Sequence, residues 1–257
     1  MTMPYSNTIY LVGGSVFVVA VVWLVYLLRR PPFSPLQWIM LWGSMLLAKR
    51  LWHTCVNNAL PVKAGQGAVL VANHRSAVDP FFIQLAANRV VHWMVAREYV
   101  EHPAFSWFLR RAGAIPTNRG GIDTAATREA IRLAANGELV GMLPEGRINM
   151  TDEFLMPVRP GAAMVALRAR VPLIPCFIDG APYNKTIYSP FFMRAKVRVT
   201  IGIPIDLSPY YDRHNDPDVV RTLIVRCMSE IARMSGRQEY DVKLAGRNWK
   251  PRPEELQ

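Results

Sequence analysis

The hydrophobic positions of the chain follow a strand–helix alternation from residue 61 onward. Short runs rich in Val, Ile and Leu, as expected of strands buried on both faces, occupy 68–72, 90–96, 139–143, 171–178 and 196–203. Between and after them, segments with the composition or spacing of helices occupy 80–88, 103–112, 124–135, 161–170 and 217–234. This alternation predicts one α/β domain with a mostly parallel central sheet flanked by helices.

A different pattern precedes the domain, because residues 9–28 form a nearly unbroken apolar run and no charged residue occurs before Arg29. Twenty residues at the helical rise span about 30 Å, the thickness of the hydrocarbon core of a bilayer. A cleavable signal peptide would have a basic start and a small-residue cleavage site, which are missing here. We expect a transmembrane helix, with a buried core helix as the alternative. Arg29 and Arg30 follow the run, which predicts a single-pass membrane protein with the rest of the chain in the cytoplasm.

A second apolar stretch, residues 36–48, is too short to span a bilayer. Its tryptophans and the basic residues at its end predict an amphipathic helix at the membrane interface, with a helix packed on the soluble domain as the alternative. The residues concerned are Trp38, Trp42, Trp52, Lys49 and Arg50. The expected organisation is thus a transmembrane anchor over 1–30, an interfacial segment over 31–60, the globular domain over 61–240 and a polar C-terminal tail over 241–257.

Composition and charge narrow the class of protein. Hydrophobic residues make up 51% of the 257 residues, which excludes a disordered chain. Three cysteines, without a C-x-x-C pair, fit a reducing compartment. The net charge of +11 could serve nucleic-acid binding, but the basic residues are scattered and no nucleic-acid-binding module is recognisable. Anionic membrane lipids are therefore the expected partners, and nucleic acid is not.

Candidate chemistry appears where the run 68–72 ends, because it leads directly into Asn73, His74 and, five residues later, Asp79 followed by Pro80. We expect Asp79 to be the N-cap of the next helix, with Pro80 at its first position. A carboxylate placed there can hold one nitrogen of His74, which leaves the other free to take a proton from an alcohol. Alternatively, Asp79 is only a cap and His74 only a loop residue.

Three further segments carry Gly, Pro and charged residues at ends of predicted elements. Gly113-Ala114-Ile115-Pro116 leads to Arg119, in a loop before a predicted helix N-terminus, where anions bind readily. Pro144-Glu145-Gly146-Arg147 follows the run 139–143, and Val171-Pro172-Leu173-Ile174-Pro175 follows the helical segment 161–170. Each segment alone is compatible with an ordinary turn or buried strand.

Together and in this order, the four blocks resemble those of the 1-acyl-glycerol-3-phosphate acyltransferase (lysophosphatidate acyltransferase) family. His74 and Asp79 match its H-x4-D block, and Gly113 to Arg119 its G-x-I-P-x-x-R block. Pro144-Glu145-Gly146 matches P-E-G, and residues 171–175 match V-P-[IV]-[IV]-P. The resemblance covers about residues 63–207, and the family also carries an N-terminal membrane-anchoring region.

The resemblance implies transfer of an acyl group from acyl-CoA or acyl carrier protein to the free hydroxyl of a lysophospholipid, first of all 1-acyl-glycerol-3-phosphate, giving phosphatidic acid. His74 would be the general base and Asp79 would orient it. The implied substrate-binding residues are Asn73, Arg119, Glu145, Gly146 and Arg147. Glu145 could alternatively orient an arginine, and Arg147 could simply pair with Glu145. No cofactor and no metal site are expected, and Cys176, inside a predicted strand, is expected to be structural.

One departure from the family concerns the acceptor. Many members have E-G-T-R-S in the third block, whereas this chain has Glu145-Gly146-Arg147-Ile148-Asn149. Members that act on other lysophospholipids can show an E-G-R-I form. A different lysophospholipid acceptor, or a catalytically silent membrane-binding relative, therefore stays as an alternative.

Overall fold

The chain forms two units, Met1–Ile39 and Met40–Gln257. The computed structural model describes residues 10, 14–15, 17–24, 34–118, 124–184, 186–246 and 249. In the first unit, residues 14–15 and 17–24 are helical, and the rest of the predicted transmembrane segment, apart from Tyr10, lies outside the described residues. Within the described ranges, no helix combines the length and apolarity needed to cross a membrane.

A reciprocal capping box starts α2 (Pro35–Arg50). The Ser34 hydroxyl accepts from the backbone N–H of Gln37 at 3.3 Å, and the Gln37 side chain accepts from the backbone N–H of Ser34 at 3.0 Å. Two of the donors that a helix start leaves unpaired are thereby satisfied. Pro35 follows the cap at the first helical position, where its missing N–H costs nothing.

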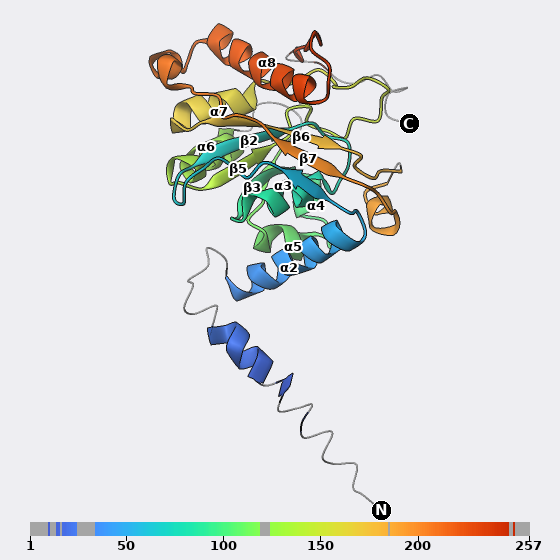
Figure 1. Cartoon of the computed structure of the whole chain (residues 1–257). Helices are drawn as coiled ribbons and strands as arrows, with labels where there is room; N and C mark the ends of the chain where they lie inside the picture. Colours follow the sequence, from blue (N-terminus) through green and yellow to red (C-terminus); the bar gives the residue numbers. More distant parts are fainter. Residues whose placement is uncertain are drawn as a thin grey trace, which may run out of the picture. The chain divides into compact units, whose positions relative to one another are not determined.

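The second unit is built on a seven-stranded sheet of order β1-β7-β6-β2-β5-β3-β4 (Figure 1). All neighbouring strands pair in parallel except β6 and β7, which are antiparallel. The strands are β1 (Cys55–Asn57), β2 (Ala68–Ala72), β3 (Val91–Ala96), β4 (Ile115–Thr117), β5 (Leu139–Met142), β6 (Leu173–Asp179) and β7 (Arg198–Ile201). The carboxyl ends of β2, β3, β4, β5 and β6 consequently lie along one edge of the sheet.

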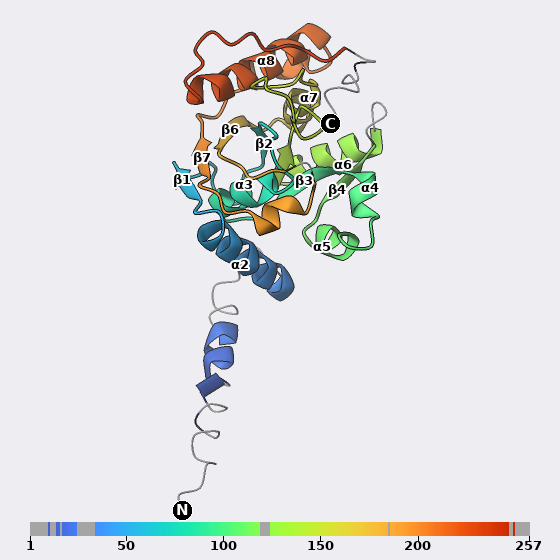
Figure 2. The ribbon, with the colours of Figure 1, turned by 90° about the vertical axis from the view of Figure 1, so that its right-hand side faces the viewer.

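Helices cover both faces of the sheet (Figures 1 and 2). They are α3 (Asp79–Ala87), α4 (Arg97–Val100), α5 (Ser106–Arg111), α6 (Thr124–Ala135), α7 (Gly161–Ala169) and α8 (Pro217–Met234), with 3-10 helices η1 (Ser189–Phe192) and η2 (Ser208–Arg213). Val69 and Val71 face the core formed with α6, α7 and α8, whereas Leu70 faces the core formed with α3. Every residue of β2 is therefore buried, which explains its unbroken apolar sequence.

The structure confirms the predicted α/β class with a mostly parallel sheet, and β2, α6 and α8 have the predicted bounds. Five short elements were not predicted, namely β1, β4, α4 and the 3-10 helices η1 and η2. Strand β4 has Pro116 at its centre, which is tolerated because the strand lies at the edge of the sheet. The antiparallel pairing of β6 and β7 is compatible with the expected mostly parallel sheet. Between β6 and β7 the described residues contain only η1, so this connection carries no crossover helix of the kind that parallel strands use.

One sequence-based expectation near the start of the domain is wrong. Trp52 is not at an interface, because it is fully buried in the core and its indole N–H donates to the carbonyl of Pro190 at 2.9 Å. At the other end, the first residues of the predicted tail over 241–257 contact the domain. Val242 is buried, and Leu244 forms a parallel bridge with Val158. Val242 thus belongs to the core although its sequence context is polar, whereas the side chain of Leu244 is exposed.

Candidate active site

The loop that follows β2 is tied to the neighbouring strand β6 by Asn73. Its side-chain amide donates to the carbonyl of Ile178 and its side-chain oxygen accepts from the backbone N–H of the same residue, both at 2.9 Å. The residue is only 2% exposed. Both polar groups of Asn73, which was expected to bind substrate, are therefore engaged in fixing where the loop leaves the sheet.

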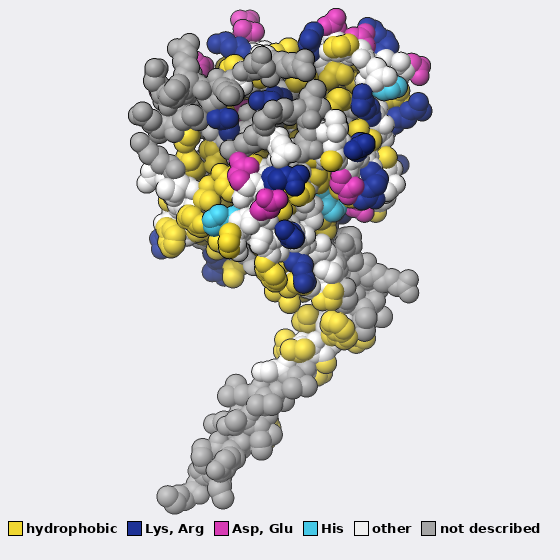
Figure 3. Space-filling model, turned by 180° about the vertical axis from the view of Figure 1, so that it is seen from behind, with side chains coloured by type: hydrophobic (Ala, Val, Ile, Leu, Met, Phe, Trp, Pro, Cys, Tyr) yellow, Lys and Arg dark blue, Asp and Glu magenta, His cyan; other side chains and the backbone are white. Residues whose placement is uncertain are grey.

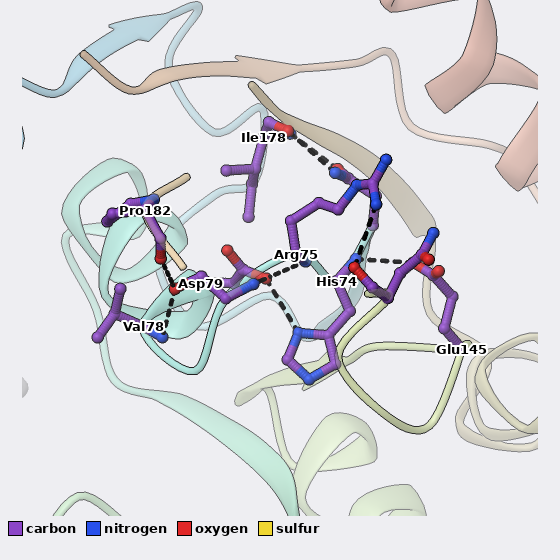
Figure 4. Close-up of polar contacts among 10 residues, drawn as sticks. His74, Arg75, Val78, Asp79, Glu145, Ile178 and Pro182 are labelled. Carbon is purple, nitrogen blue, oxygen red and sulfur yellow. Dashed lines mark hydrogen bonds and ion pairs between the residues drawn. The ribbon is translucent and has the colours of Figure 1, made fainter. Parts of the chain in front are cut away.

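His74 lies at the start of this loop, and its Nδ1 is 2.9 Å from Oδ2 of Asp79 (Figure 4). The same oxygen accepts the backbone N–H groups of Arg75 at 2.7 Å and Ser76 at 2.8 Å. An ionised carboxylate only accepts hydrogen bonds, so Nδ1 carries the proton and Nε2 has the free lone pair. In Figure 4 the second ring nitrogen of His74 points away from Asp79.

Asp79 holds this position from inside α3, not as its N-cap. The N-cap is Val78, which makes no capping bond, and Pro80 is the second residue of the helix. The expected capping role was wrong because the carboxylate of Asp79 turns back to the loop instead of bonding the first helical N–H groups. Asp79 is fully buried while the His74 side chain is 15% exposed, so the imidazole is the member of the pair that a substrate can reach.

Glu145 supports His74 from the turn after the adjacent strand β5. Its Oε1 accepts the backbone N–H of His74 at 2.7 Å and its Oε2 accepts the backbone N–H of Met156 at 2.9 Å. Burial raises the pKa of Glu145 to about 8, against the opposing effect of these two hydrogen bonds. Both oxygens are thus taken by backbone donors, which is the geometry of a residue that positions a loop.

The segment after Glu145 wraps around the loop that carries His74. Gly146 has a left-handed φ of +73°, and the backbone N–H of Asn149 donates to the carbonyl of His74 at 2.7 Å. The side chain of Arg147 is partly buried in this turn. Arg119, which was also expected to bind substrate, lies outside the described residues.

Sequence reasoning missed the role of Arg75, which follows His74 directly. Its guanidinium donates to the carbonyls of Asn149 at 3.1 Å, Thr151 at 2.8 Å and Glu153 at 3.0 Å. The planar fork of arginine suits several acceptors at once. The one available signal was a cation inside the loop between two candidate catalytic residues. Arg75 thereby fastens residues 149–153 to the backbone that bears His74.

Two cavities flank this edge of the sheet. One, of about 410 Å³, has Asn73, Arg75, Asn149 and Arg237 among the residues that line it, together with aromatic side chains from β6 and the following loop. The other, of about 370 Å³, lies at the ends of β3 and β4, and it is lined by Arg97, Val100, Glu101, Arg110, Ala114 and Pro116. Arg97 and Arg110 were not singled out from sequence.

The described residues contain no cluster of three or more His, Cys, Asp or Glu side chains able to hold a metal ion. Cys176 lies inside β6, and burial raises the pKa of its thiol to about 12. A thiol with that pKa stays protonated and is a poor nucleophile. The contact of His74 Nδ1 with Asp79 is an arrangement that can support proton removal by the imidazole.

Comparison with known proteins gives consistent matches. A family model described as Acyltransferase matches residues 53–179. Two curated relatives named 1-acyl-sn-glycerol-3-phosphate acyltransferase are similar to the chain. The Bacillus subtilis protein is 26% identical over 58% of this chain and 72% of its own length. The Streptococcus pneumoniae protein is 29% identical over 65% of this chain and 60% of its own length.

A solved structure shares the fold. It is the crystal structure of the 1-acyl-sn-glycerophosphate acyltransferase PlsC from Thermotoga maritima, with a TM-score of 0.59 and 20% sequence identity. The match covers 93% of this chain and all of that one.

Proposed function

We propose that this chain is a 1-acyl-glycerol-3-phosphate acyltransferase that acylates its lipid acceptor at a membrane surface. The match of residues 53–179 to the Acyltransferase family model and the similarity to the two curated relatives support this proposal. The acyl group comes from a thioester, acyl-CoA or acyl carrier protein, and the product is phosphatidic acid. The observation that carries the proposal is the 2.9 Å contact between His74 Nδ1 and Asp79 Oδ2, at the carboxyl end of the central strand β2.

The proposed reaction begins with the acceptor hydroxyl at Nε2 of His74. An alcohol is a poor nucleophile at neutral pH, and a positioned base contributes about 10²–10⁴-fold in rate. As His74 takes the proton, the hydroxyl oxygen attacks the thioester carbonyl and forms a tetrahedral intermediate. Its collapse breaks the C–S bond, and the imidazolium returns the proton to the departing thiolate. The negative charge of Asp79 stabilises the imidazolium between the two steps.

The family resemblance assigns the acceptor phosphate to Arg119 and Arg147, beside the P-E-G turn that contains Gly146. Arginine binds two phosphate oxygens at once, which suits a glycerol phosphate headgroup. The contacts described for Asn73 and Glu145 support positioning roles for both, because the side-chain polar groups of each form hydrogen bonds with backbone groups. In this proposal they hold the loop that presents His74 to the substrates.

The apolar run 9–28 and the basic residues after it support a single-pass anchor with the acyltransferase domain on the cytoplasmic face. A lipid acceptor and an insoluble product make such a location useful, because neither has to cross water.

The test is a panel of lyso-acceptors that differ in headgroup, each supplied with acyl-CoA or with acyl carrier protein, and with products identified by mass. We expect phosphatidic acid from 1-acyl-glycerol-3-phosphate, and no product from His74→Ala. If another lysophospholipid is acylated preferentially, the proposed acceptor is wrong but the proposed reaction stands. The departure from the family pattern at Arg147 is compatible with that result. A folded protein without thioester consumption for any acceptor would overturn the proposal.

A further inference from the structure

Large aromatic side chains are exposed on two short helices of the second unit. Trp107 on α5 is 57% exposed, and Tyr188, at the start of η1, is 45% exposed. Phe191 and Phe192 within η1 are 36% and 86% exposed. We call these four residues the aromatic patch. Exposed apolar groups that cluster in this way mark interaction sites, in contrast to single exposed hydrophobic residues.

Ring contacts join the two helices of the patch into one surface. Phe105, at the start of α5, stacks on Tyr188 with a centroid distance of 5.3 Å. Phe81 of α3 stacks on Phe108 at 5.7 Å and meets Phe191 edge-on at 6.4 Å. Tyr188 and Phe191 of the patch therefore rest on packed rings, which connect η1 with α3 and α5.

Basic side chains border the aromatic patch. Arg110 and Arg111 form the last turn of α5, and the Arg111 guanidinium lies 6.0 Å from the ring centroid of Trp107. Exposed cations also follow η1, at Arg194, and end α2, at Lys49 and Arg50. Figure 3 shows hydrophobic side chains along the lower part of one face of the domain, with Lys and Arg side chains nearby.

The patch lies on the side of the sheet where the candidate active site is. Helix η1 follows the carboxyl end of β6, and α4 and α5 follow the carboxyl end of β3. His74 follows the carboxyl end of β2 at the same edge. A layer of lipid in contact with the patch would thus border the edge of the sheet that carries the imidazole.

We propose that the aromatic patch inserts into the boundary between headgroups and acyl chains of a bilayer that contains anionic lipids. Trp and Tyr combine an apolar ring with a polar edge and concentrate at this depth of a membrane. The surrounding arginines and lysines pair with anionic headgroups. This contact belongs to the catalytic domain itself and is separate from residues 1–39. The membrane contact is a proposal beyond acyl transfer. Only its use, to bring a lipid acceptor to the active site, rests on the proposed function.

The proposal is tested with a fluorophore on the full chain. Cys55 is the exposed cysteine and is replaced by serine, whereas Cys176 and Cys227 are fully buried and do not react. Phe192→Cys in this background carries an environment-sensitive dye. The matched control is Ile203→Cys, because Ile203 is 81% exposed and follows β7, whose end lies at the opposite edge of the sheet.

In vesicles of phosphatidylcholine with about one third phosphatidylglycerol, the dye at position 192 should shift its emission to the blue. Lipid-borne quenchers should reach it, and aqueous iodide should quench it several-fold less than the dye at position 203. The shielding should weaken in phosphatidylcholine alone, since the basic border then loses its partners. Trp107→Cys provides a second labelled position on the other helix of the patch.

Equal iodide quenching at positions 192 and 203, in protein that still transfers acyl groups, would overturn the inference and leave the proposed function intact. Shielding that disappears when the protein is diluted at constant lipid would assign the patch to contact with a second copy, and would also overturn it. Shielding in a protein without acyl transfer would support the membrane contact while the proposed function fails. The two proposals can therefore fail separately.

Discussion

Glu145 accepts a 2.7 Å hydrogen bond from the backbone N–H of His74. A carboxyl group on the turn after β5 therefore fixes the loop after the neighbouring strand β2, which carries the imidazole. The carbonyl of His74 is bonded as well, by the N–H of Asn149 at 2.7 Å. With Nδ1 bonded to Asp79, three atoms of His74 have fixed partners. Such a residue can present Nε2 in a constant place, as catalysis by a positioned base requires.

The first prediction concerns the His74–Asp79 pair. His74→Ala should lower kcat by at least about 100-fold, because the base is removed, and the fold should be retained. Asp79→Asn should also lower kcat by roughly 100-fold, because the charge that stabilises the imidazolium is lost. Steady-state kinetics beside circular dichroism measure both effects.

Asp79→Asn should keep its structure for a specific reason. The three bonds of Asp79 all end on Oδ2, and its Oδ1 has no hydrogen-bond partner in the described part of the chain. An amide oxygen in the place of Oδ2 therefore preserves the contacts. Asp218→Asn, at a residue 84% exposed, is the matched control. Normal turnover in the Asp79 variant would contradict the assignment.

The second prediction concerns pH and Glu145, whose pKa rises from an ordinary 4.5 to about 8 on folding. Between these values the native state holds a proton that the unfolded state has released. As the pH rises from 4.5 to about 8, the free energy of unfolding should therefore fall by about 1.4 kcal/mol for each pH unit. Glu145→Gln lacks this contribution, so melting curves of both proteins at several pH values isolate it. Parallel pH dependences would show that the carboxyl is ionised in the folded protein.

Glu145→Gln should also slow the reaction. A glutamine has one acceptor oxygen, so one of the two backbone N–H groups of His74 and Met156 loses its partner. We expect kcat to fall roughly 10–100-fold as the imidazole shifts, with a smaller change in KM. A change confined to KM would instead indicate that Glu145 contacts the substrate. Glu153→Gln, at an exposed residue of the same segment, serves as the control.

The third prediction concerns Arg75, which binds three carbonyls of residues 149–153. Arg75→Lys keeps the charge but loses the planar fork, so the free energy of unfolding should fall by about 1–3 kcal/mol. Amide hydrogen exchange over 149–153 should accelerate before that of β2 changes. Arg221→Lys, on the exposed side of α8, should alter neither. Unchanged exchange in the Arg75 variant would mean that other contacts hold the segment.

A fourth prediction concerns the acceptor phosphate. If Arg147 binds it, Arg147→Lys should lower kcat/KM for the acceptor by roughly 10–150-fold, with a smaller effect on the donor. Arg119→Lys should behave in the same way. Arg132→Lys is the control, because Arg132 is exposed and pairs with Glu129 on the same helix. Equal losses for both substrates, together with a lower melting temperature, would assign Arg147 a structural role.

The fifth prediction concerns the orientation of the predicted anchor. With Cys55 replaced by serine, a cysteine introduced by Met3→Cys should react with an impermeant reagent outside intact cells, since the basic residues after 9–28 favour the cytoplasmic side. Labelling of Met3→Cys only in permeabilised cells would show that the N-terminus lies in the cytoplasm and would contradict the prediction. Ile203→Cys, in the domain, provides the opposite reference because it should react after permeabilisation.

The parts of the fold that sequence predicted are those in which local pattern and tertiary burial agree. Residues 68–72 are uniformly apolar because helices cover both faces of β2, and 217–234 alternates as a helix with one buried side. The edge strands β1 and β4 were not predicted. Strand β4 has three residues with a proline among them, so its strand character arises from pairing with β3 and not from its own composition.

The candidate site shows the same division. The spacing of His74 and Asp79 was sufficient to predict their contact, because both lie in one short loop. The contact of Glu145 with His74 and those of Arg75 with residues 149–153 join segments about seventy residues apart, and sequence spacing does not predict such contacts. Trp52 illustrates the opposite error: an aromatic residue beside basic ones resembled an interfacial anchor, and only the contact with Pro190 reveals a core residue.

The burial of β2 has a consequence for how the protein loses its activity on heating. The strand lies between β5 and β6 and is covered on both sides, so its amides exchange only when the whole domain opens. His74 is the second residue after this strand, and its backbone is bonded on both sides. Inactivation should therefore coincide with global unfolding and not precede it, in contrast to enzymes whose reactive groups stand on mobile loops. Heat-treated samples should consist of fully active and fully inactive molecules, with no population of folded protein that has lost its turnover.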